Sequence, residues 1–338
     1  YAEAESLLDR LLASGPSLDN HVLALALLGE VRHARARFDK AFDAYAQANA
    51  AFLALHGSGP AISQTAFTER VHASLKSSGL GARPPLRLAP VPGEAVRHVF
   101  VLGFPRSGTT LMENILASLP GAQALEERPT LRAADHAFLI PPQGMSDLAG
   151  IDEPAAERLR ADYWNAVFAA GVDRAAPLFV DMDPLKSLRL PIISRLFPDA
   201  LVVQMQRDPR DVVWSCFRTA FAPTSAAFEF TSLEKAARLY AAMMALVDAC
   251  RTGLPLRLKT VRYEALVSDF ESETRALCDF LGTDWTEDLL RFDRTAVRRG
   301  VGTASLTQVR RGLYDGSGQW RPYRRYLEPV LPILQPSI

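Results

Sequence analysis

The chain has 338 residues, with 38 basic and 38 acidic side chains and a formal net charge of zero. This length predicts about two domains, and the charge balance argues against nucleic acid or an anionic membrane as the main partner. No apolar run approaches the roughly 18 residues needed to cross a bilayer, so no membrane span is expected.

The cysteines indicate a reducing compartment. The chain has three, Cys216, Cys250 and Cys278, widely spaced on segments of helical pattern. An odd number at such spacing is neither a disulfide framework nor a metal cluster. We therefore expect a cytoplasmic protein without a metal site.

Residues 1–80 are rich in alanine and leucine and are predicted to be helical throughout. Large and small residues recur at the spacing of a tetratricopeptide repeat, at Leu25, Leu28, Gly29, Ala41, Tyr45 and Ala48. An earlier run has the pattern of a second repeat helix, at Ala4, Leu8, Leu11 and Pro16. Further repeats are expected upstream of Tyr1, and a helix at about 61–77 is expected to cap the stack. The alternative is a plain helical bundle.

Residues 81–96 contain four prolines and are predicted to form an extended linker. Beyond them, from 97 to 338, apolar runs alternate with helical patterns. The predicted strands are Val99–Leu102, Leu178–Asp181, Ala200–Gln206 and Leu256–Val261, and the predicted helices are Thr110–Leu119, Pro184–Phe197, Pro209–Arg218 and Phe270–Leu281. This alternation predicts an α/β domain, a parallel sheet with helices on both faces.

A phosphate-binding loop is predicted between the first of these strands and its helix. The spacing Gly103-xxxx-Gly108 matches the loop of nucleotide triphosphatases, but Thr109 stands where that loop carries lysine. Such a lysine reaches the β- and γ-phosphates of a triphosphate. Here Arg106 lies inside the turn and two hydroxyl residues follow it, Thr109 and Thr110. The loop is therefore predicted to hold one terminal phosphate at a helix N-terminus, without magnesium.

The sequence Pro105-Arg106-Ser107-Gly108-Thr109-Thr110-Leu111 resembles the loop of the sulfotransferases that use 3′-phosphoadenosine 5′-phosphosulfate (PAPS). It is most similar to the loops of the tyrosylprotein sulfotransferases and of bacterial sulfotransferases fused to tetratricopeptide repeats. The resemblance covers roughly residues 97–325. It implies a P-loop-type sulfotransferase fold, PAPS as the donor and adenosine 3′,5′-bisphosphate as the product, with no metal. In this family the loop contacts the 5′-phosphate, which implies a donor role for Arg106, Ser107, Gly108, Thr109 and Thr110.

A second phosphate site is implied at the end of the strand 200–206. In the family an arginine at this strand end and a serine eight residues later hold the 3′-phosphate, and Arg207 and Ser215 stand at these positions. Arginine suits the task because its guanidinium is a rigid, permanently charged fork. The structural alternative is that Arg207 pairs with Asp208 or Asp211 at the start of the next helix.

Three further donor contacts follow from the resemblance. Tyr263, in Val261-Arg262-Tyr263-Glu264, matches a tyrosine near the adenine. Ser305 and Arg310 lie in a segment that resembles a loop folding over the nucleotide. Arg310 can alternatively be a surface residue.

The resemblance also implies a catalytic base. Sulfuryl transfer removes a proton from the acceptor hydroxyl, and a carboxylate whose pKa is raised by burial can accept it. Family members carry a glutamate 21 residues beyond the loop arginine, which here is Glu127. The adjacent Glu126 and Arg128 leave open a solvated turn instead, and His136 is the alternative base.

One position departs from the family. Relatives carry a lysine just after the strand 178–181, near the bridging oxygen, and Met182 stands there. A thioether carries no positive charge to offset the charge on the leaving group. Lys186 is the first candidate to replace that lysine and Arg106 the second; otherwise the enzyme is slow.

Two classes of function follow. The first is a PAPS-dependent sulfotransferase acting on a hydroxyl acceptor, either protein or peptide tyrosine or a small molecule, with the helical repeats binding peptides or mediating self-association. The second is a repeat-based binding or scaffold protein whose sulfotransferase-like domain binds nucleotide but turns over poorly. A P-loop kinase ranks third, because Thr109 replaces the lysine.

Overall fold

The computed structural model describes residues 1–293, 313 and 315–337. The chain forms two compact units, each made of several segments. Unit 1 contains Tyr1–Thr68, Asp208–Ala242 and Gly316–Ile338, and unit 2 contains Glu69–Arg207 and Met243–Asp315. The predicted division into residues 1–80, 81–96 and 97–338 does not follow these units and stays a prediction.

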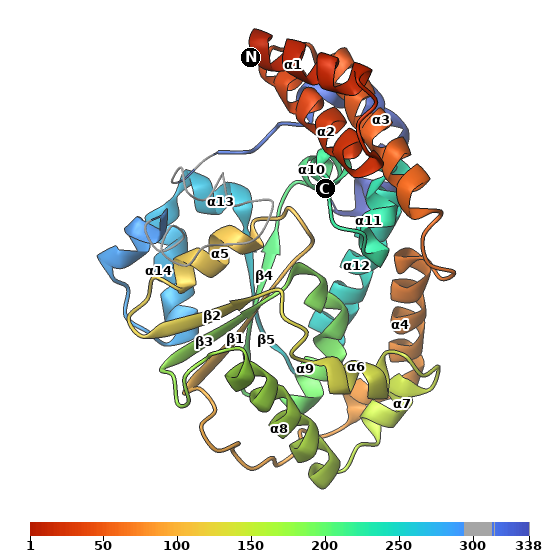
Figure 1. The fold of residues 1–338 in the computed structure, drawn as a ribbon. Helices are drawn as coiled ribbons and strands as arrows, with labels where there is room; N and C mark the ends of the chain where they lie inside the picture. Colours follow the sequence, from red (N-terminus) through yellow and green to blue (C-terminus); the bar gives the residue numbers. More distant parts are fainter. Residues whose placement is uncertain (294–312, 314, 338) are drawn as a thin grey trace. The chain divides into compact units, whose positions relative to one another are not determined.

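Unit 2 is built around a five-stranded sheet in the order β2-β3-β1-β4-β5 (Figure 1). Its strands are β1 (Arg97–Leu102), β2 (Ala122–Glu126), β3 (Leu178–Met182), β4 (Leu201–Gln206) and β5 (Arg257–Arg262). Every neighbouring pair is parallel, as predicted. Four strands confirm the sequence prediction, whereas β2 was not predicted. All five carboxyl ends lie at one edge of the sheet, where ligands bind in folds of this kind.

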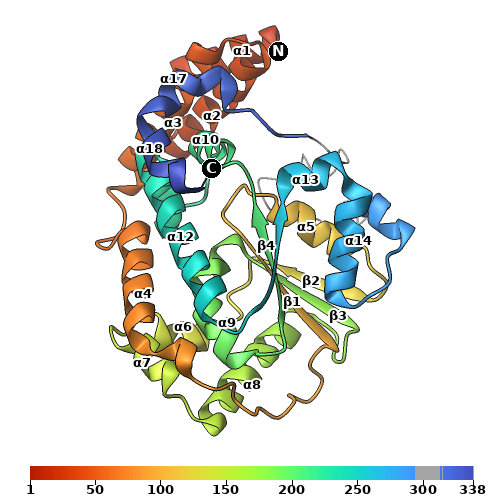
Figure 2. The ribbon, with the colours of Figure 1, turned by 180° about the vertical axis from the view of Figure 1, so that it is seen from behind.

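Helices cover both faces of this sheet (Figures 1 and 2). Among the described residues, the helices that lie wholly in unit 2 are α5 (Thr109–Leu116), α6 (Arg132–Phe138), α7 (Gly144–Ala149), α8 (Glu153–Ala169), α9 (Leu190–Leu196), α13 (Tyr263–Ser268) and α14 (Phe270–Leu281), with the 3₁₀ helices η1 (Leu80–Ala82), η2 (Pro184–Arg189) and η3 (Glu287–Arg291). Alternate strand residues such as Val101 and Val203 pack with α5, α13 and α14 in one buried apolar cluster. The parallel sheet with helices on both faces is thus confirmed.

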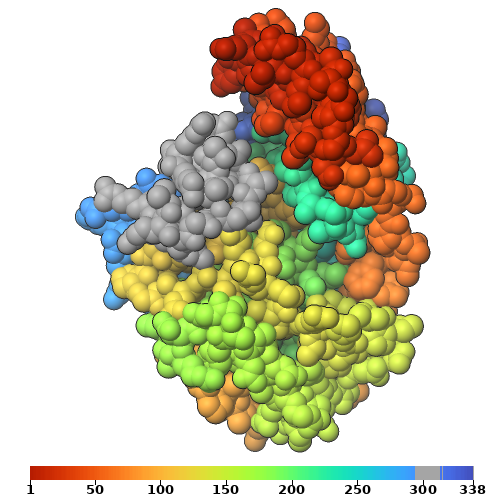
Figure 3. All heavy atoms as spheres, viewed as in Figure 1, coloured from red at the N-terminus to blue at the C-terminus, as the bar shows by residue number. Residues whose placement is uncertain are grey.

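The opposite face of the sheet packs against α8 and α9. His98 of β1 lies among Tyr163, Trp164 and Phe197, with ring centroids 4.9 to 5.4 Å from its own. Burial, together with the charges of Arg160 and Lys186, lowers the pKa of His98 to about 3, so this ring is neutral. The outward side of α8, yellow-green in Figure 3, carries polar residues such as Arg158, Asp162 and Asn165.

The predicted helix Pro184–Phe197 forms as two pieces. The first turn is the 3₁₀ helix η2, and α9 begins at Leu190. Pro191 has no backbone N–H with which to continue a helical ladder, so it is accommodated in the first turn of a new helix. Because of this break, η2 is a separate 3₁₀ helix next to the phosphate loop and not the first turn of α9.

The predicted linker lies mostly outside helices and strands. Residues 83–96 have no regular secondary structure. The backbone N–H groups of Arg87 and Ala89 donate to Glu153 and Glu157 on α8. The proline-rich segment is therefore part of unit 2 and lies beside α8.

Unit 1 is all-helical. Its helices are α1 (Ala2–Ala13), α2 (Leu18–Ala34), α3 (Phe38–His56), α10 (Pro209–Arg218), α11 (Ser225–Phe230), α17 (Arg324–Leu327) and α18 (Leu331–Leu334), with the 3₁₀ helices η4 (Arg321–Tyr323), η5 (Glu328–Val330) and η6 (Gln335–Ser337). Two more helices, α4 (Gln64–Ser78) and α12 (Leu233–Gly253), have residues in both units.

Helices α2 and α3 pack small residues under large ones, as the sequence pattern predicts. A Cβ atom on Gly29 would lie 2.4 Å from the ring of Tyr45, so only glycine permits this approach. The expected helices of this segment are confirmed. Their assignment to tetratricopeptide repeats stays a prediction.

The carboxyl-terminal segment is anchored inside unit 1. The buried carboxylate of Asp211 accepts hydrogen bonds from the backbone N–H groups of Gly318 and Trp320, at 2.7 and 3.0 Å. Tyr323 stacks on Trp214 with ring centroids 3.7 Å apart. Within the described part of the chain, no helix is both long and apolar enough to span a membrane.

Candidate active site

The phosphate loop connects β1 to α5 and is tightly folded. A Cβ atom on Gly103 would lie 2.5 Å from Ser107 Oγ, so the backbone there approaches too closely for any other residue. Ser107 Oγ accepts a hydrogen bond from the backbone N–H of Phe104 at 3.2 Å. Gly108, with φ of 101°, leads into α5. Because a helix leaves its first N–H groups without intrahelical acceptors, this geometry provides a cradle for an anion.

Arg106 lies at the tip of this loop in a strained conformation. Its φ is 71°, in the left-handed region that residues with a Cβ atom rarely adopt. Such strain persists only where the surroundings enforce it and is common at ligand sites. The backbone carbonyl of Arg106 accepts a hydrogen bond from Arg207 Nη1 at 3.1 Å.

Arg207 and Tyr263 are brought together beside the loop. Arg207 follows β4, and its guanidinium carbon lies 4.6 Å from the centre of the Tyr263 ring. Tyr263 begins α13, immediately after β5, and a Cβ atom on Gly108 would lie 2.9 Å from its ring. Two predicted donor contacts therefore meet the predicted phosphate loop in one cluster. Arginine stacked on an aromatic ring keeps its orientation and its charge.

Glu127 directly follows β2, in a turn with φ of 49°. Its backbone N–H donates to the carbonyl of Met182, the last residue of β3, at 2.7 Å. The side chain is open to solvent at the surface of unit 2. Partial burial of the carboxyl, followed by the negative charges of Asp183 and Glu126, raises its pKa, while the charge of Lys186 lowers it. A carboxylate that is accessible and has a raised pKa suits a general base.

Lys186 lies inside the protein rather than at the edge of the sheet. Its side chain is 1% exposed and forms an ion pair with Asp181. Its ammonium also donates to the backbone carbonyl of Arg128 at 3.1 Å. The second Asp181 oxygen accepts hydrogen bonds from Thr130 Oγ1 at 2.7 Å and from the Tyr163 hydroxyl at 2.9 Å.

Met182 is fully buried in the apolar cluster between the sheet and helices α5, α13 and α14. It pairs with Val101 of β1 and Glu126 of β2. The position where the family resemblance implies a lysine is thus part of the core here.

The remaining predicted residues are Ser215, Ser305, Arg310 and His136. Ser215 is buried on α10 and belongs to unit 1, whereas Arg207 belongs to unit 2. Ser305 and Arg310 fall outside the described residues. His136 is exposed on α6.

Asp208 and Asp211 are the carboxylates with which Arg207 was alternatively expected to pair. Asp208 binds the guanidinium of Arg210, with 2.5 Å between Oδ2 and Nη2, and Arg210 stacks on Trp320. Asp211 accepts the two backbone N–H groups of the carboxyl-terminal segment. Both carboxylates thus have other partners within unit 1.

The strand order separates two sides of the site. Arg207 and Tyr263 follow β4 and β5 on one side of the phosphate loop, and Glu127 follows β2 on the other. Because neighbouring strands lie about 4.8 Å apart, β2 lies about 10 Å from β1. The predicted donor contacts Arg207 and Tyr263 and the predicted base Glu127 therefore lie on opposite sides of the phosphate loop.

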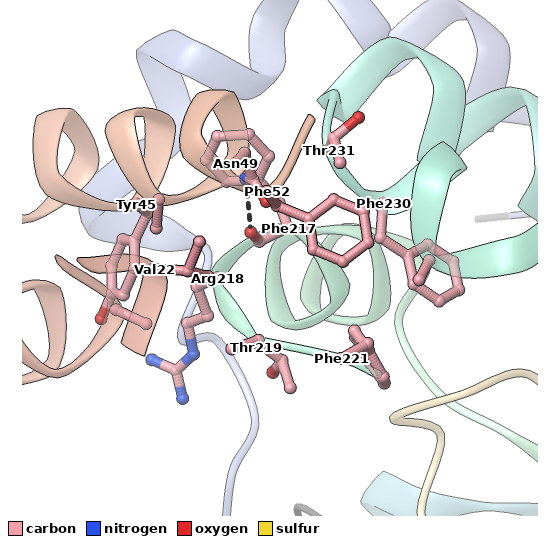
Figure 4. Close-up of a pocket in the computed structure, with 14 residues that line it drawn as sticks. Val22, Tyr45, Asn49, Phe52, Phe217, Arg218, Thr219, Phe221, Phe230 and Thr231 are labelled. Atoms are coloured by element: carbon pink, nitrogen blue, oxygen red, sulfur yellow. Dashed lines mark hydrogen bonds between the residues drawn. The ribbon is translucent and has the colours of Figure 1, made fainter. Parts of the chain in front are cut away.

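Unit 1 has a small cavity of its own, between α2, α3 and the segment around α10 and α11 (Figure 4). Its volume is about 20 Å³, which is room for about one water molecule. The lining is mainly apolar, and Asn49 donates across it to the carbonyl of Phe217. None of the predicted site residues lines this cavity. The described residues contain no group of three or more side chains that could hold a metal ion.

Sequence reasoning missed the partners of Lys186, namely Asp181, Thr130 and Tyr163. Asp181 gave a usable signal, because a carboxylate at the end of an otherwise apolar strand must find a positive partner when buried. Thr130 and Tyr163 gave none, since only the fold brings them to β3.

Comparisons with known proteins agree with this geometry. The sequence profile of the Sulfotransferase family matches residues 98–287, more than half of the chain. An uncharacterized protein of Aquifex aeolicus (strain VF5) is 30% identical over 249 residues, which cover 71% of this chain and 32% of that protein.

Two animal relatives are protein-tyrosine sulfotransferases. Protein-tyrosine sulfotransferase A of Caenorhabditis elegans is 26% identical, covering 58% of this chain and 52% of the relative. Protein-tyrosine sulfotransferase 1 of Danio rerio is 29% identical, covering 63% and 60%. Among solved structures, the sulfotransferase domain of the Synechococcus olefin synthase aligns with 73% of this chain at 21% identity and a TM-score of 0.42, too low to add to the assignment.

The chain thus spans less than two thirds of the length of each of these three relatives. The profile match includes the phosphate loop, the turn of Glu127, the ends of all five strands and Tyr263. On this match the chain belongs to the Sulfotransferase family, and it is similar to protein-tyrosine sulfotransferases.

Proposed function

We propose that this protein transfers the sulfuryl group of PAPS to a hydroxyl acceptor. The observation that carries the proposal is the cluster in which Arg207 contacts both the carbonyl of Arg106 in the phosphate loop and the ring of Tyr263. One loop of the cluster suits the 5′-phosphate, and the arginine beside it suits a second phosphate. Adenosine 3′,5′-bisphosphate carries these two groups on one nucleoside.

The donor side is assigned residue by residue. The loop residues Arg106, Ser107, Gly108, Thr109 and Thr110 hold the 5′-phosphate through side chains and helix N–H groups. Arg207 binds the 3′-phosphate and Tyr263 lies near the adenine. Ser215, Ser305 and Arg310 complete the donor contacts in this proposal, on the strength of the family resemblance alone.

The reaction is an in-line displacement at sulfur. The acceptor oxygen forms a bond to sulfur, and the bond from sulfur to the 5′-phosphate oxygen breaks, so adenosine 3′,5′-bisphosphate leaves with the electron pair. Glu127 takes the acceptor proton. Arg106 and the loop N–H groups stabilise the negative charge that develops on the leaving phosphate.

Lys186 has an indirect part in this mechanism. Its ammonium is bound by Asp181, and its charge lowers the pKa of Glu127. We therefore assign Lys186 to the base and not to the leaving oxygen, so Arg106 is the cation assigned to the leaving 5′-phosphate.

The acceptor is proposed to be a tyrosine in a protein or peptide. Support comes from the relatives, which are named protein-tyrosine sulfotransferases, and from the helices of residues 1–80, which are suited to bind a peptide or a second copy of the chain. All three cysteines are buried free thiols, consistent with a reducing cytoplasm.

One observation favours a second function, a scaffold protein that binds nucleotide but turns over poorly. Met182 is buried where relatives carry lysine, and Lys186 is held by Asp181. No other lysine follows β3 before α9. In this case nucleotide binding survives and transfer is slow even with a good acceptor.

Glu127→Gln tests the proposal because it preserves shape while removing the proton acceptor. We expect unchanged binding of adenosine 3′,5′-bisphosphate and a fall in transfer to a tyrosine peptide of about 10²–10⁴-fold. The matched control is Glu126→Gln, the same change at the adjacent residue, which should retain transfer. Equal activity of wild type and Glu127→Gln would remove Glu127 as the base and turn attention to His136.

A further inference from the structure

Two consecutive residues of η2 contact the two loops that carry the proposed chemistry. Lys186 Nζ donates to the carbonyl of Arg128, next to Glu127, at 3.1 Å. Ser187 Oγ donates to the carbonyl of Gly103, the first residue of the phosphate loop, at 2.8 Å. Both side chains are buried, so neither of them is available to a ligand as they stand.

Three anchors hold the turn of Glu127 to β3 and η2. The first is the bond from Lys186 to Arg128, and the second is the backbone bond from Glu127 to Met182. The third is the bond from Thr130 Oγ1 to Asp181 Oδ2 at 2.7 Å. The turn needs such support because Glu127 has a positive φ, which is unfavourable for a residue with a Cβ atom.

Asp181 is itself rigidly held. It is fully buried and accepts bonds from Lys186, Thr130 and the hydroxyl of Tyr163. The hydroxyl oxygen of Tyr163 in turn lies 2.6 Å from His98 Nε2. Because the tyrosine proton goes to Asp181, the assigned tautomer of the neutral His98 donates from Nε2. A carboxylate this deep, with each oxygen paired, has one orientation.

We propose that η2 is a positioning element for both sides of the site. Lys186, together with Asp181 and Thr130, fixes the turn of Glu127. Ser187 fixes the start of the phosphate loop. This inference rests on the proposed function, because it takes Glu127 as the base. It assigns to Thr130, Asp181 and Ser187 a role in alignment, exerted through residues that touch the substrates. Small displacements of a base or a phosphate cradle are enough to slow a reaction markedly.

Two mild substitutions should affect the two sides of the site differently. Thr130→Val keeps the shape and loses the bond to Asp181, so kcat for a tyrosine peptide should fall about tenfold while the affinity for adenosine 3′,5′-bisphosphate stays within about twofold. Ser187→Ala loses the bond to Gly103, so that affinity should fall by about three- to tenfold. Thr130→Ser, which restores the hydroxyl, should restore kcat.

The matched control is Thr274→Val on α14. Thr274 is also buried, donates to the carbonyl of Phe270 and accepts a hydrogen bond from Trp285 Nε1. Losing this hydroxyl is the same chemical change in the same unit, at a residue whose hydrogen-bond partners are Phe270, Glu271 and Trp285, which belong to neither loop. It should change neither kcat nor the nucleotide affinity by more than about twofold.

Amide hydrogen exchange tests the alignment without any acceptor. Thr130→Val should speed exchange in residues 124–132 and leave 100–112 unchanged, and Ser187→Ala should do the reverse. Faster exchange spread over the whole unit, or none in either segment, would overturn the proposal. Thr130→Ala serves if the valine variant does not fold.

The Glu127→Gln variant separates the positioning role of Thr130 from the assignment of Glu127 as the base. If Thr130 acts through Glu127, Thr130→Val leaves the residual rate of Glu127→Gln within about twofold. An equal loss of rate in both backgrounds would overturn the positioning role and leave the proposed base intact. Full activity of Glu127→Gln would overturn the base, and the positioning role with it.

Discussion

At the scale of single residues, Arg207 makes two contacts beside the phosphate loop. One N–H group supports the carbonyl of Arg106, and the guanidinium lies over Tyr263. Asp208 pairs with Arg210, and Asp211 accepts from the backbone of the carboxyl-terminal segment, both within unit 1. Arg207 thus connects the phosphate loop with the residue that begins α13.

Replacing Arg207 by alanine should remove a charge-assisted contact with the 3′-phosphate. We expect the affinity for adenosine 3′,5′-bisphosphate to fall by about 1.5–3 kcal/mol. Adenosine 5′-phosphate lacks the 3′-phosphate, so its affinity should fall less. The remaining loss would come from the missing hydrogen bond between Arg207 and the carbonyl of Arg106. Calorimetry with both nucleotides measures the difference. Equal losses would mean that Arg207 acts only through the loop.

The pH dependence of transfer should report the environment of Glu127. The base must be ionised, so kcat falls as pH drops through its pKa. Because partial burial and the charges of Asp183 and Glu126 raise that pKa, the fall should begin above the range of an ordinary glutamate. Asp183→Asn removes one negative charge but can still accept from the N–H of Leu185, so it should move the fall to lower pH. An unmoved profile would contradict the assignment.

The pair of Lys186 and Asp181 should dominate the stability of this region. Lys186→Met leaves Asp181 buried without its cation, which we expect to lower the free energy of unfolding by about 3–5 kcal/mol. Removing both charges in Lys186→Met with Asp181→Asn should restore more than half of the loss in urea unfolding. A double variant that is less stable than Lys186→Met would show that the pair is not coupled in this way.

At the scale of elements, the strand that precedes Glu127 could not be predicted from the sequence. Residues Ala122–Glu126 are rich in alanine, leucine and glutamate, which favour helices. Pairing with β3 makes them a strand, and such pairing is a tertiary effect that outweighs local propensity. Short apolar runs made β1, β3 and β4 predictable, and these three strands are mostly buried, whereas β5 is mostly half-buried or exposed.

The same contrast holds for the site. The sequence predicted the phosphate loop from its glycine spacing, and the family resemblance implied Arg207 and Tyr263. In the structure each of them follows a strand, and the carboxyl ends of parallel strands meet at one edge of the sheet. The sequence could not show that Lys186 turns inward to Asp181, because a side chain's partner depends on the fold. Nor could it show that Arg207 and Ser215 belong to different compact units.

Helix α10 and the carboxyl-terminal segment should be coupled in stability through Asp211. Asp211→Ala leaves the N–H groups of Gly318 and Trp320 without this acceptor, and we expect a loss of about 1.5–3 kcal/mol in urea unfolding. The control is Asp39→Ala, which removes an exposed ion pair with Arg325 and should cost about 1 kcal/mol or less. Equal effects of the two variants would contradict an anchoring role for Asp211.

At the scale of the whole molecule, the proposed functions depend on the binding of adenosine 3′,5′-bisphosphate. A ligand that binds only the folded protein raises its stability by mass action, by about 2.7 kcal/mol at a hundredfold excess over Kd. The sulfotransferase and scaffold proposals both require this binding and differ only in turnover. A kinase would instead require a magnesium triphosphate.

The most direct test is therefore calorimetry of adenosine 3′,5′-bisphosphate binding, with Mg²⁺ and with a chelator. Both phosphates are expected to be held by arginine and by N–H groups, so the account predicts the same Kd in the two conditions and tighter binding than for ATP. Binding that requires Mg²⁺, or a preference for ATP, would contradict it.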